Sequence, residues 1–160
     1  MDIMTPEKRS ALMSRIKGKG TTPELYIERL MSAGGLQFGQ HDPSLPGKPD
    51  FVFREDSVAV FIDGDFWHGW RFPVWQHKLS DQWQQKISTN RNRDDRNHRK
   101  LRRWGWTVLR IWEHQVEADP VGCVGRIASV VTSQVVDLEL VKACYSELPK
   151  LKRRRRLPKP

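Results

Sequence analysis

The chain has 160 residues, of which 38% are hydrophobic, and a formal net charge of +9. This length predicts one domain with its own core, and without an apolar stretch of about 18 residues we expect no transmembrane helix. The first ten residues lack the apolar segment of a signal peptide. Cys123 and Cys144 lie outside every motif, so we expect free thiols in a cytoplasmic protein.

Most of the net charge lies at the end of the chain. Residues 150–160 hold seven basic and no acidic side chains, and removing these seven charges from nine leaves +2. A proline-containing run of like charges cannot bury apolar area, so we expect it to be disordered when free. We therefore divide the chain into a domain of residues 1–149 and a basic tail. The tail suits phosphate binding, although a purely solubilising role is the alternative.

Two helices are predicted before the first core strand. Thr5-Pro6-Glu7 places a capping hydroxyl before a proline, which predicts a helix to about Ile16. Thr22-Pro23-Glu24 repeats that signal, and Gly34-Gly35 ends the second helix. The apolar face of the second helix is predicted to consist of Leu25, Ile27, Leu30 and Met31.

The rest of the chain alternates between predicted strands and helices. The expected elements are a short strand at Leu36–Gln40, a loop at His41–Lys48, strands at Phe51–Phe53 and Val58–Ile62, a loop at Gly64–Pro73, a long helix from Ser80 to about Arg103, a strand at Trp106–Trp112, and one or two helices within Asp119–Leu148. Continuous apolar strands are buried on both faces. The sequence therefore predicts an α/β fold in which helices flank a small mixed sheet.

Two aspartates are expected to meet at one end of the central hairpin. If the turn is centred on Glu55-Asp56, the residue opposite Asp50 is Phe61 or Ile62, which brings Asp50 close to Asp63. Two adjacent carboxylates repel each other unless a cation lies between them, and Mg²⁺ prefers oxygen ligands. The spacing therefore indicates a magnesium site, although two solvated aspartates at strand ends would show the same spacing.

The long helix carries a carboxylate on its apolar face. Residues spaced by 4, 3, 4 and 7 positions share this face: Trp83, Ile87, Asn90, Asp94 and Leu101. A carboxylate that faces inward needs a partner. Asp94 is therefore either a site residue or one half of a structural ion pair. The surrounding arginines could pair with it or contact DNA, namely Arg91, Arg93, Arg96 and Arg99.

The loop between Gly64 and Gly69 contains Phe66, Trp67 and His68. Aromatic side chains near basic residues can stack on bases or insert between base pairs. His68 is the best candidate for a general base because its unperturbed pKa lies near neutral pH. The alternative is that the aromatic residues belong to the core and that His68 only caps the loop.

An ordered set of segments in this sequence resembles the very short patch repair (Vsr) endonucleases. The matching segments are 13–19, 22–25, 45–50, 60–69, 83–87, 92–94 and 105–113, which lie within residues 5–118. This resemblance implies a restriction-endonuclease-like core and an enzyme that hydrolyses a phosphodiester bond of DNA with one or two Mg²⁺ ions.

The resemblance also assigns roles to individual residues at the metal. Asp50 would be the central metal-binding carboxylate, with the backbone carbonyl of Ile62 as a second ligand. Asp63 matches the next position and would hold the metal or a water molecule beside it. Glu24 and Asp94 would orient further water molecules around the metal.

The remaining roles concern the attacking water and the DNA. His68 would activate the water. Phe66, Trp67 and Trp83 match aromatic residues that insert beside the mismatch. Lys48 and Arg93 lie in the matching segments, and we expect them to contact DNA as well.

The chain departs from the family at a structural zinc site that many members have. The corresponding positions hold Asp65, Trp70, Phe72 and His114. Tryptophan and phenylalanine cannot ligate zinc, and a structural site needs four ligands. We therefore expect no structural zinc, and we expect Asp65 and His114 to form a hydrogen bond or ion pair.

Three functions remain under consideration. The first is an endonuclease that nicks beside the thymine of a T:G mismatch, and the aromatic set favours it over the second, a restriction or mobile-element endonuclease that cuts matched DNA. The third is a non-catalytic DNA-binding protein, which would gain nothing from carboxylates that face phosphates. The expected partner is double-stranded DNA with a T:G mismatch. We expect a monomer that does not bind membranes.

Overall fold

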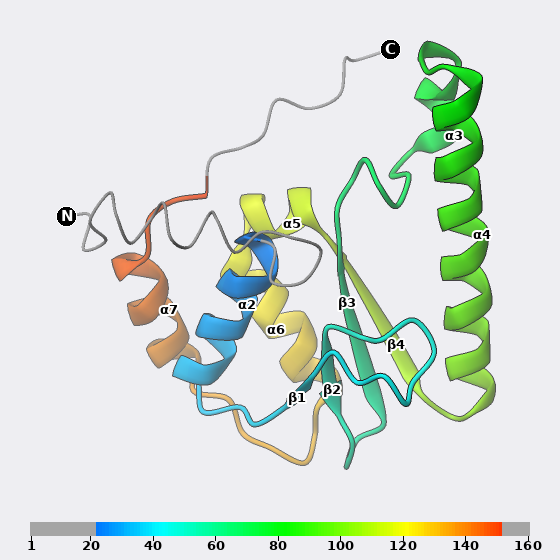
Figure 1. The fold of residues 1–160 in the computed structure, drawn as a ribbon. Helices are drawn as coiled ribbons and strands as arrows, with labels where there is room; N and C mark the ends of the chain where they lie inside the picture. Colours follow the sequence, from blue (N-terminus) through cyan, green and yellow to red (C-terminus); the bar gives the residue numbers. More distant parts are fainter. Residues whose placement is uncertain (1–21, 152–160) are drawn as a thin grey trace.

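A computed structural model describes residues 22–151 of the chain. Figure 1 shows a twisted sheet between a long helix, α4 (Asp81–Arg103), and a group of helices that includes α2 (Thr22–Ala33), α6 (Pro120–Val130) and α7 (Leu138–Glu147). This arrangement confirms the predicted α/β class with a small mixed sheet flanked by helices. The helix predicted for Thr5–Ile16 and nearly all of the basic tail lie outside the described residues, so both stay predictions.

Helix α2 spans Thr22–Ala33, as the capping signal and the following glycine pair predicted. Ile27, Leu30 and Met31 are completely buried. The prediction was less accurate at Leu25, which is half-buried, because the neighbouring Tyr26 occupies the buried position instead.

The sheet contains four strands in the order β1-β2-β3-β4. Their bounds are Gly39–Gln40 for β1, Phe51–Phe53 for β2, Val58–Asp63 for β3 and Thr107–Trp112 for β4. The first three strands are antiparallel, whereas β4 runs parallel to β3. The strand predicted over Leu36–Gln40 is shorter than expected because only its last two residues pair with β2.

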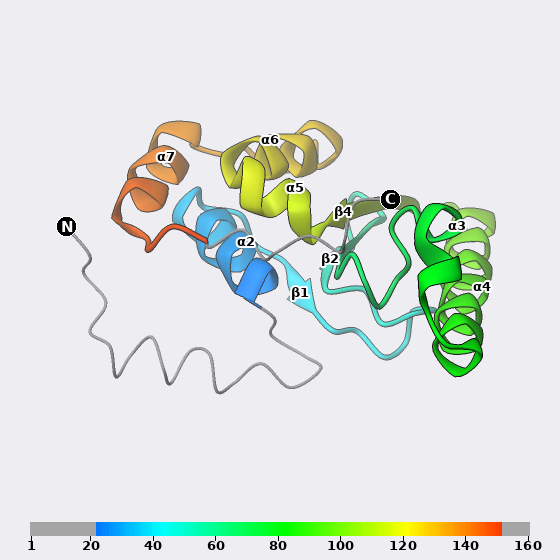
Figure 2. The same cartoon turned by 90° about the horizontal axis from the view of Figure 1, so that it is seen from above.

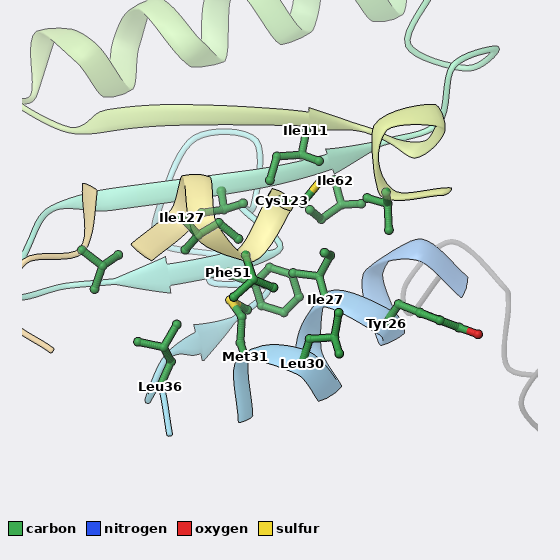
Figure 3. Packing of buried hydrophobic residues seen from close by; sticks show 14 of the residues in the cluster. Tyr26, Ile27, Leu30, Met31, Leu36, Phe51, Ile62, Ile111, Cys123 and Ile127 are labelled. Atoms are coloured by element: carbon green, nitrogen blue, oxygen red, sulfur yellow. The ribbon is translucent and has the colours of Figure 1, made fainter. Parts of the chain in front are cut away.

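One face of the sheet carries the main core. Val58, Val60 and Ile62 of β3 pack with Ile111 of β4 against helices α2, α5 (Glu113–Ala118), α6 (Pro120–Val130) and α7 (Leu138–Glu147). Figure 3 shows Phe51 and Ile127 in this layer beside the side chains of α2. The single predicted region of weak helices thus corresponds to α6 and α7, and α5 directly follows β4.

Helix α4 (Asp81–Arg103) covers the opposite face of the sheet, as the view from above in Figure 2 makes clear. Ala59 and Phe61 of β3 pack there against Leu101. Ser80 precedes the helix and Gly105 follows it with a φ of 87°, both as predicted. No helix in the described part of the chain is long and apolar enough to span a membrane.

The segment before α4 contains more regular structure than the predicted loop. Residues Phe72–Trp75 form a short helix, α3, and Gln76–Lys78 form a turn of 3₁₀ helix, η1. Phe72 and Trp75 pack on Ile87 of α4 and form a small core of their own. This small core attaches the preceding loop to α4.

Candidate active site

A cleft of about 910 Å³ lies at the end of the sheet where Asp63 terminates β3. All five predicted catalytic residues line this cleft: Glu24, Asp50, Asp63, His68 and Asp94. Five of the other predicted site residues line it as well, namely Lys48, Ile62, Phe66, Trp67 and Arg93. Only Trp83 is outside the lining, and it contacts Trp67 at a ring separation of 5.5 Å.

The hairpin of β2 and β3 brings Asp50 and Asp63 to this cleft. Phe51 pairs with Val60, so Asp50 lies opposite Phe61, as the predicted turn required. The N–H of Ile62 donates a hydrogen bond of 2.7 Å to Oδ2 of Asp50. This bond fixes the orientation of the Asp50 carboxylate at the mouth of the hairpin.

Glu24, His41 and Asp50 form one cluster, which we call the Asp50 group. One potential ligand atom from each residue lies within 4.8 Å of the others. Nε2 of His41 contacts Oε1 of Glu24 and lies 3.6 Å from Oδ1 of Asp50. His41 was predicted only as part of a loop. Its N–H donates a hydrogen bond to the carbonyl of Asp50, which extends the pairing of β1 with β2 by one residue.

The Asp50 group concentrates negative charge in a buried place. Burial and the nearby charge of Glu24 raise the pKa of Asp50 to about 9, and Asp63 adds to this effect against the hydrogen bond from Ile62. A divalent cation would relieve the repulsion between these carboxylates. The donor set, two carboxylates and one imidazole, fits a cation that accepts oxygen and nitrogen ligands.

Asp63, His68 and Asp94 form a second cluster, which we call the Asp63 group. Nδ1 of His68 donates to Oδ2 of Asp94 at 2.7 Å, and Nε2 lies 3.5 Å from Oδ1 of Asp63. Asp94 reaches this position because the buried face of α4 carries it inward, as its helical spacing predicted. The histidine is therefore held by one carboxylate and directed towards the other.

Arg110, which was not among the predicted site residues, contacts both carboxylates of the Asp63 group. Nε of Arg110 donates to Oδ2 of Asp63 at 2.6 Å, and Nη2 donates to Oδ2 of Asp94 at 3.1 Å. Pairing of Asp94 with an arginine of α4 was one of the predicted alternatives, and Arg93 approaches it at 4.0 Å. The alternation of side chains along β4 could have identified Arg110, because Val108 and Arg110 share a face that points towards α4.

These contacts shift the pKa values of His68 and Asp94 in opposite directions. Burial alone would lower the pKa of His68, but the hydrogen bond to Asp94 and the charges of Asp63 and Asp94 outweigh it and raise the pKa. Burial would raise the pKa of Asp94, but the hydrogen bond with His68 and the charges of His68 and Arg110 lower it. Asp94 is therefore ionised and accepts the Nδ1–H of His68.

His98 is a buried residue of the cleft that was not predicted as a site residue either. It follows Asp94 by four positions, one helical turn along the same buried face, and is 5% exposed. Its ring lies 4.6 Å from that of Phe61. Burial, followed by the charge of Arg110, lowers the pKa of His98, so this imidazole is neutral at physiological pH.

An exposed aromatic cluster borders the cleft. Trp67 is 47% exposed and Trp83 is 39% exposed, whereas Phe66 is half-buried beneath them at ring separations of 5.3 and 5.7 Å. Nζ of Lys86 lies 5.2 Å from the ring centres of both tryptophans. The alternative that both loop aromatics belong to the core is thus wrong for Trp67, which presents a large ring to solvent.

Helix α4 holds the aromatic loop in place. Nδ2 of Asn90 donates to the carbonyl of Trp67 at 3.0 Å. Gly69 has a φ of 73°, and a Cβ atom there would lie 2.6 Å from Cδ of Arg91 and 3.0 Å from Ile87. Only glycine permits this close packing of the loop on α4.

The loop is braced on its other side by the predicted acid–histidine pair. Nδ1 of His114 lies 2.8 Å from Oδ1 of Asp65, which confirms the expected contact. The ring of Trp70 packs on His114 at 4.7 Å and on Trp112 at 5.1 Å. Phe72 is 3% exposed in the small core beside α4. The absence of structural zinc stays a prediction.

Comparison with known proteins places the chain among DNA-cutting enzymes. The family model described as DNA mismatch endonuclease Vsr matches residues 1–73. The Type II nicking enzyme V.NmeDIP of Neisseria meningitidis serogroup C is 38% identical over 137 residues, which cover 82% of this chain and 90% of that protein.

Two further relatives show similar identity. The Type II nicking enzyme V.HpaIIP of Haemophilus parainfluenzae is 38% identical over 124 residues, which cover 75% of this chain and 88% of that enzyme. The DNA mismatch endonuclease Vsr of Escherichia coli (strain K12) is 35% identical over 117 residues, which cover 70% of this chain and 73% of that protein.

Proposed function

The chain belongs to the Vsr family and is a DNA endonuclease, and from this premise we propose that it nicks double-stranded DNA beside the thymine of a T:G mismatch. In this proposal it acts as a monomer and requires Mg²⁺. One observation carries the proposal, namely that two exposed tryptophans lie beside a cleft of carboxylates and an oriented histidine.

The Asp50 group is the proposed site of Mg²⁺. The carboxylates of Glu24 and Asp50 supply the oxygen atoms that this ion prefers, and the carbonyl of Ile62 would be a further ligand. When bound, the ion stabilises the negative charge that develops on the phosphate and acidifies water. His41 would keep the Glu24 carboxylate in position through its hydrogen bond.

His68 is the proposed general base. Its Nδ1–H is held by Asp94, so Nε2 is the nitrogen that accepts a proton from the attacking water. Because its pKa is raised, a larger share of His68 is protonated near neutral pH than for a free histidine. We therefore expect the rate of cutting to increase with pH until His68 has lost its proton.

The aromatic cluster is the proposed sensor of the mismatch. Inserting a side chain between base pairs unstacks one step and requires a few kcal/mol, and a mispaired step opens more easily than a matched one. Trp67 and Trp83 are exposed enough to enter a base step, and Phe66 supports them from below. Lys48 and Arg93 are exposed at the cleft and would contact phosphates.

The direct test compares duplexes that differ only by one base. A duplex with a T:G mismatch, the matched T:A duplex and the matched C:G duplex are incubated with the protein and Mg²⁺, and the products are resolved by strand. We expect one nick, in the thymine strand of the mismatched duplex. Cutting of matched DNA in both strands would instead support a restriction or mobile-element enzyme, and binding without cutting would support a non-catalytic protein.

A further inference from the structure

Arg110 contacts both carboxylates of the Asp63 group. We propose that Arg110 takes the place of a second metal ion, so that the cleft binds a single divalent cation at the Asp50 group. This inference rests on the proposed metal-dependent function. In this inference Asp63 pairs with Arg110 and is not a ligand of the metal, in contrast to the expectation from the sequence.

One oxygen of each carboxylate in the Asp63 group already accepts a hydrogen bond from Arg110. Oδ2 of Asp63 accepts a hydrogen bond of 2.6 Å from Arg110. Oδ2 of Asp94 accepts from both His68, at 2.7 Å, and Arg110, at 3.1 Å. A metal ion bound to these oxygens would have to displace a guanidinium that is always charged.

The side chain of Arg110 is fixed in place by its strand and its neighbours. Its position on β4 pairs in parallel register with Phe61 of β3, which directs the side chain towards α4. Cζ of Arg110 lies 4.2 Å from the ring centre of Trp112, at a distance typical of a cation–π contact. Two carboxylates and one ring therefore hold the guanidinium, and its side chain is only 23% exposed.

The carboxyl of Asp50 differs from those of the Asp63 group in its partners. It contacts the N–H of Ile62 at 2.7 Å, Nε2 of His41 at 3.6 Å and the carboxyl of Glu24. None of these three groups is a permanent cation. The Asp63 group contains the same donor types, but a resident cation already neutralises it. A divalent ion from solution is therefore expected to bind at the Asp50 group.

Arg110 thus acts as a positioning residue. It neutralises Asp63 and Asp94 without competing for a coordination position at the metal. Because Asp94 remains ionised, it continues to accept the Nδ1–H of His68 and leaves Nε2 directed into the cleft. The side chain supplies to one half of the cleft the charge that a second metal ion would otherwise supply.

Counting the Mn²⁺ ions bound per chain tests this inference without a measurement of DNA cutting. The full chain is freed of metal with a chelator, and Mn²⁺ is titrated while the free ion is followed by electron paramagnetic resonance. We expect the wild type to bind one ion per chain, Asp50→Asn to lose it, and Asp63→Asn to keep it. Two ions in the wild type, or loss of the ion in Asp63→Asn with retention in Asp50→Asn, would overturn the inference.

A second pair of variants tests whether Arg110 excludes a metal ion. Arg110→Met should bind one ion more than the wild type, and the matched loss of charge in Arg103→Met should leave the number of bound ions unchanged, because Arg103 is exposed at the end of α4. A folded Arg110→Met protein that still binds one ion would contradict the exclusion. Circular dichroism shows whether this variant folds, and the Asp63→Asn measurement decides the question if it does not.

The outcomes separate this inference from the proposed function. If the wild type binds no Mn²⁺ and does not nick the T:G duplex, the proposed metal-dependent function fails. If it nicks the T:G duplex and binds two ions, only the role of Arg110 fails. Arg110→Lys adds a further readout. Lysine keeps the positive charge that Arg110→Met removes, but not the fork of donors of arginine. We therefore expect the pH profile of cutting by Arg110→Lys to lie between those of the wild type and Arg110→Met.

Discussion

The Asp50 group and the Asp63 group have the same composition but different surroundings. Each contains two carboxylates and one imidazole within 4.8 Å of one another. The Asp63 group is neutralised by an arginine from the neighbouring strand, whereas burial beside Glu24 raises the pKa of Asp50 to about 9. The comparison teaches that donor residues alone do not define a metal site, because the charge next to them decides whether a cation is still needed.

The largest expected effect is that of Asp50→Ala. We expect the rate of nicking in Mg²⁺ to fall by roughly 10³-fold or more, because metal ions stabilise the transition state by several kcal/mol and each 1.36 kcal/mol corresponds to about a factor of ten. DNA binding should be largely retained. Asp42→Ala is the matched control, since Asp42 pairs with Arg54 outside the cleft. Nicking within tenfold of wild type would rule out Asp50 as the metal ligand.

The opposite half of the cleft is tested by His68→Ala. A lost general base slows the chemical step by roughly 10²–10⁴, and single-turnover rates with saturating enzyme would measure this directly. The remaining rate should no longer increase with pH in the range where His68 titrates. His77→Ala, an exposed histidine on η1, serves as the control. Unchanged single-turnover rates in His68→Ala would mean that this histidine has only a structural role.

A smaller effect is expected from the aromatic cluster. Trp67→Ala should weaken binding to a T:G duplex by about 1–3 kcal/mol, the usual contribution of stacking one base on an aromatic ring. Binding to the matched duplex should change less. Trp104→Ala is a suitable control, because Trp104 is 52% exposed directly after the other end of α4. Equal losses on both duplexes would argue against a role of Trp67 in sensing the mismatch.

The smallest effect concerns stability, and it separates the two groups without DNA. Because the pKa of Asp50 is raised in the folded protein, the stability linked to its protonation is present below about pH 4 and is lost as the pH rises towards about 9. The metal-free wild type should therefore lose Tm over this range relative to Asp50→Asn. Added Mg²⁺ should restore the Tm of the wild type, most strongly at high pH.

Thermal unfolding followed by circular dichroism would measure this difference at a series of pH values. Subtracting the Asp50→Asn curve removes the contribution of His68, whose raised pKa acts in the same direction. A difference between the two proteins that does not depend on pH would show that Asp50 keeps its ordinary pKa in the folded chain.

Local sequence patterns predicted the elements that carry most of the site. The turn between Phe53 and Val58 set the hairpin register, so the convergence of Asp50 and Asp63 on one cleft followed from short-range pairing. Helical spacing placed Asp94 on the buried face of α4 in the same way. The Asp65–His114 contact came from the family resemblance instead.

The rest of the site depends on pairing between segments that are distant in the sequence, and it could not be predicted from local patterns. The register of β4 on β3 places Arg110 beside Phe61, but the two strands are joined through the whole of α4, so no local signal fixes it. His41 contacts Asp50 through a strand of only two residues, which has no apolar pattern to reveal it. Arg110 carries a charge and His41 can bind a proton. Both side chains therefore affect which half of the cleft attracts a cation.

The packing of α2 has a consequence for how far this enzyme can be shortened. Every proposed catalytic residue precedes Trp112, yet Glu24 is carried by a helix whose apolar face is covered by Val124 and Ile127 of α6 and Val141 of α7. The N–H of Asp137 also bonds to the carbonyl of Gly34 at 3.0 Å. A minimal nuclease therefore cannot end at the last catalytic residue. It must extend through α7, because the last third of the chain acts as a scaffold for an acid near the beginning.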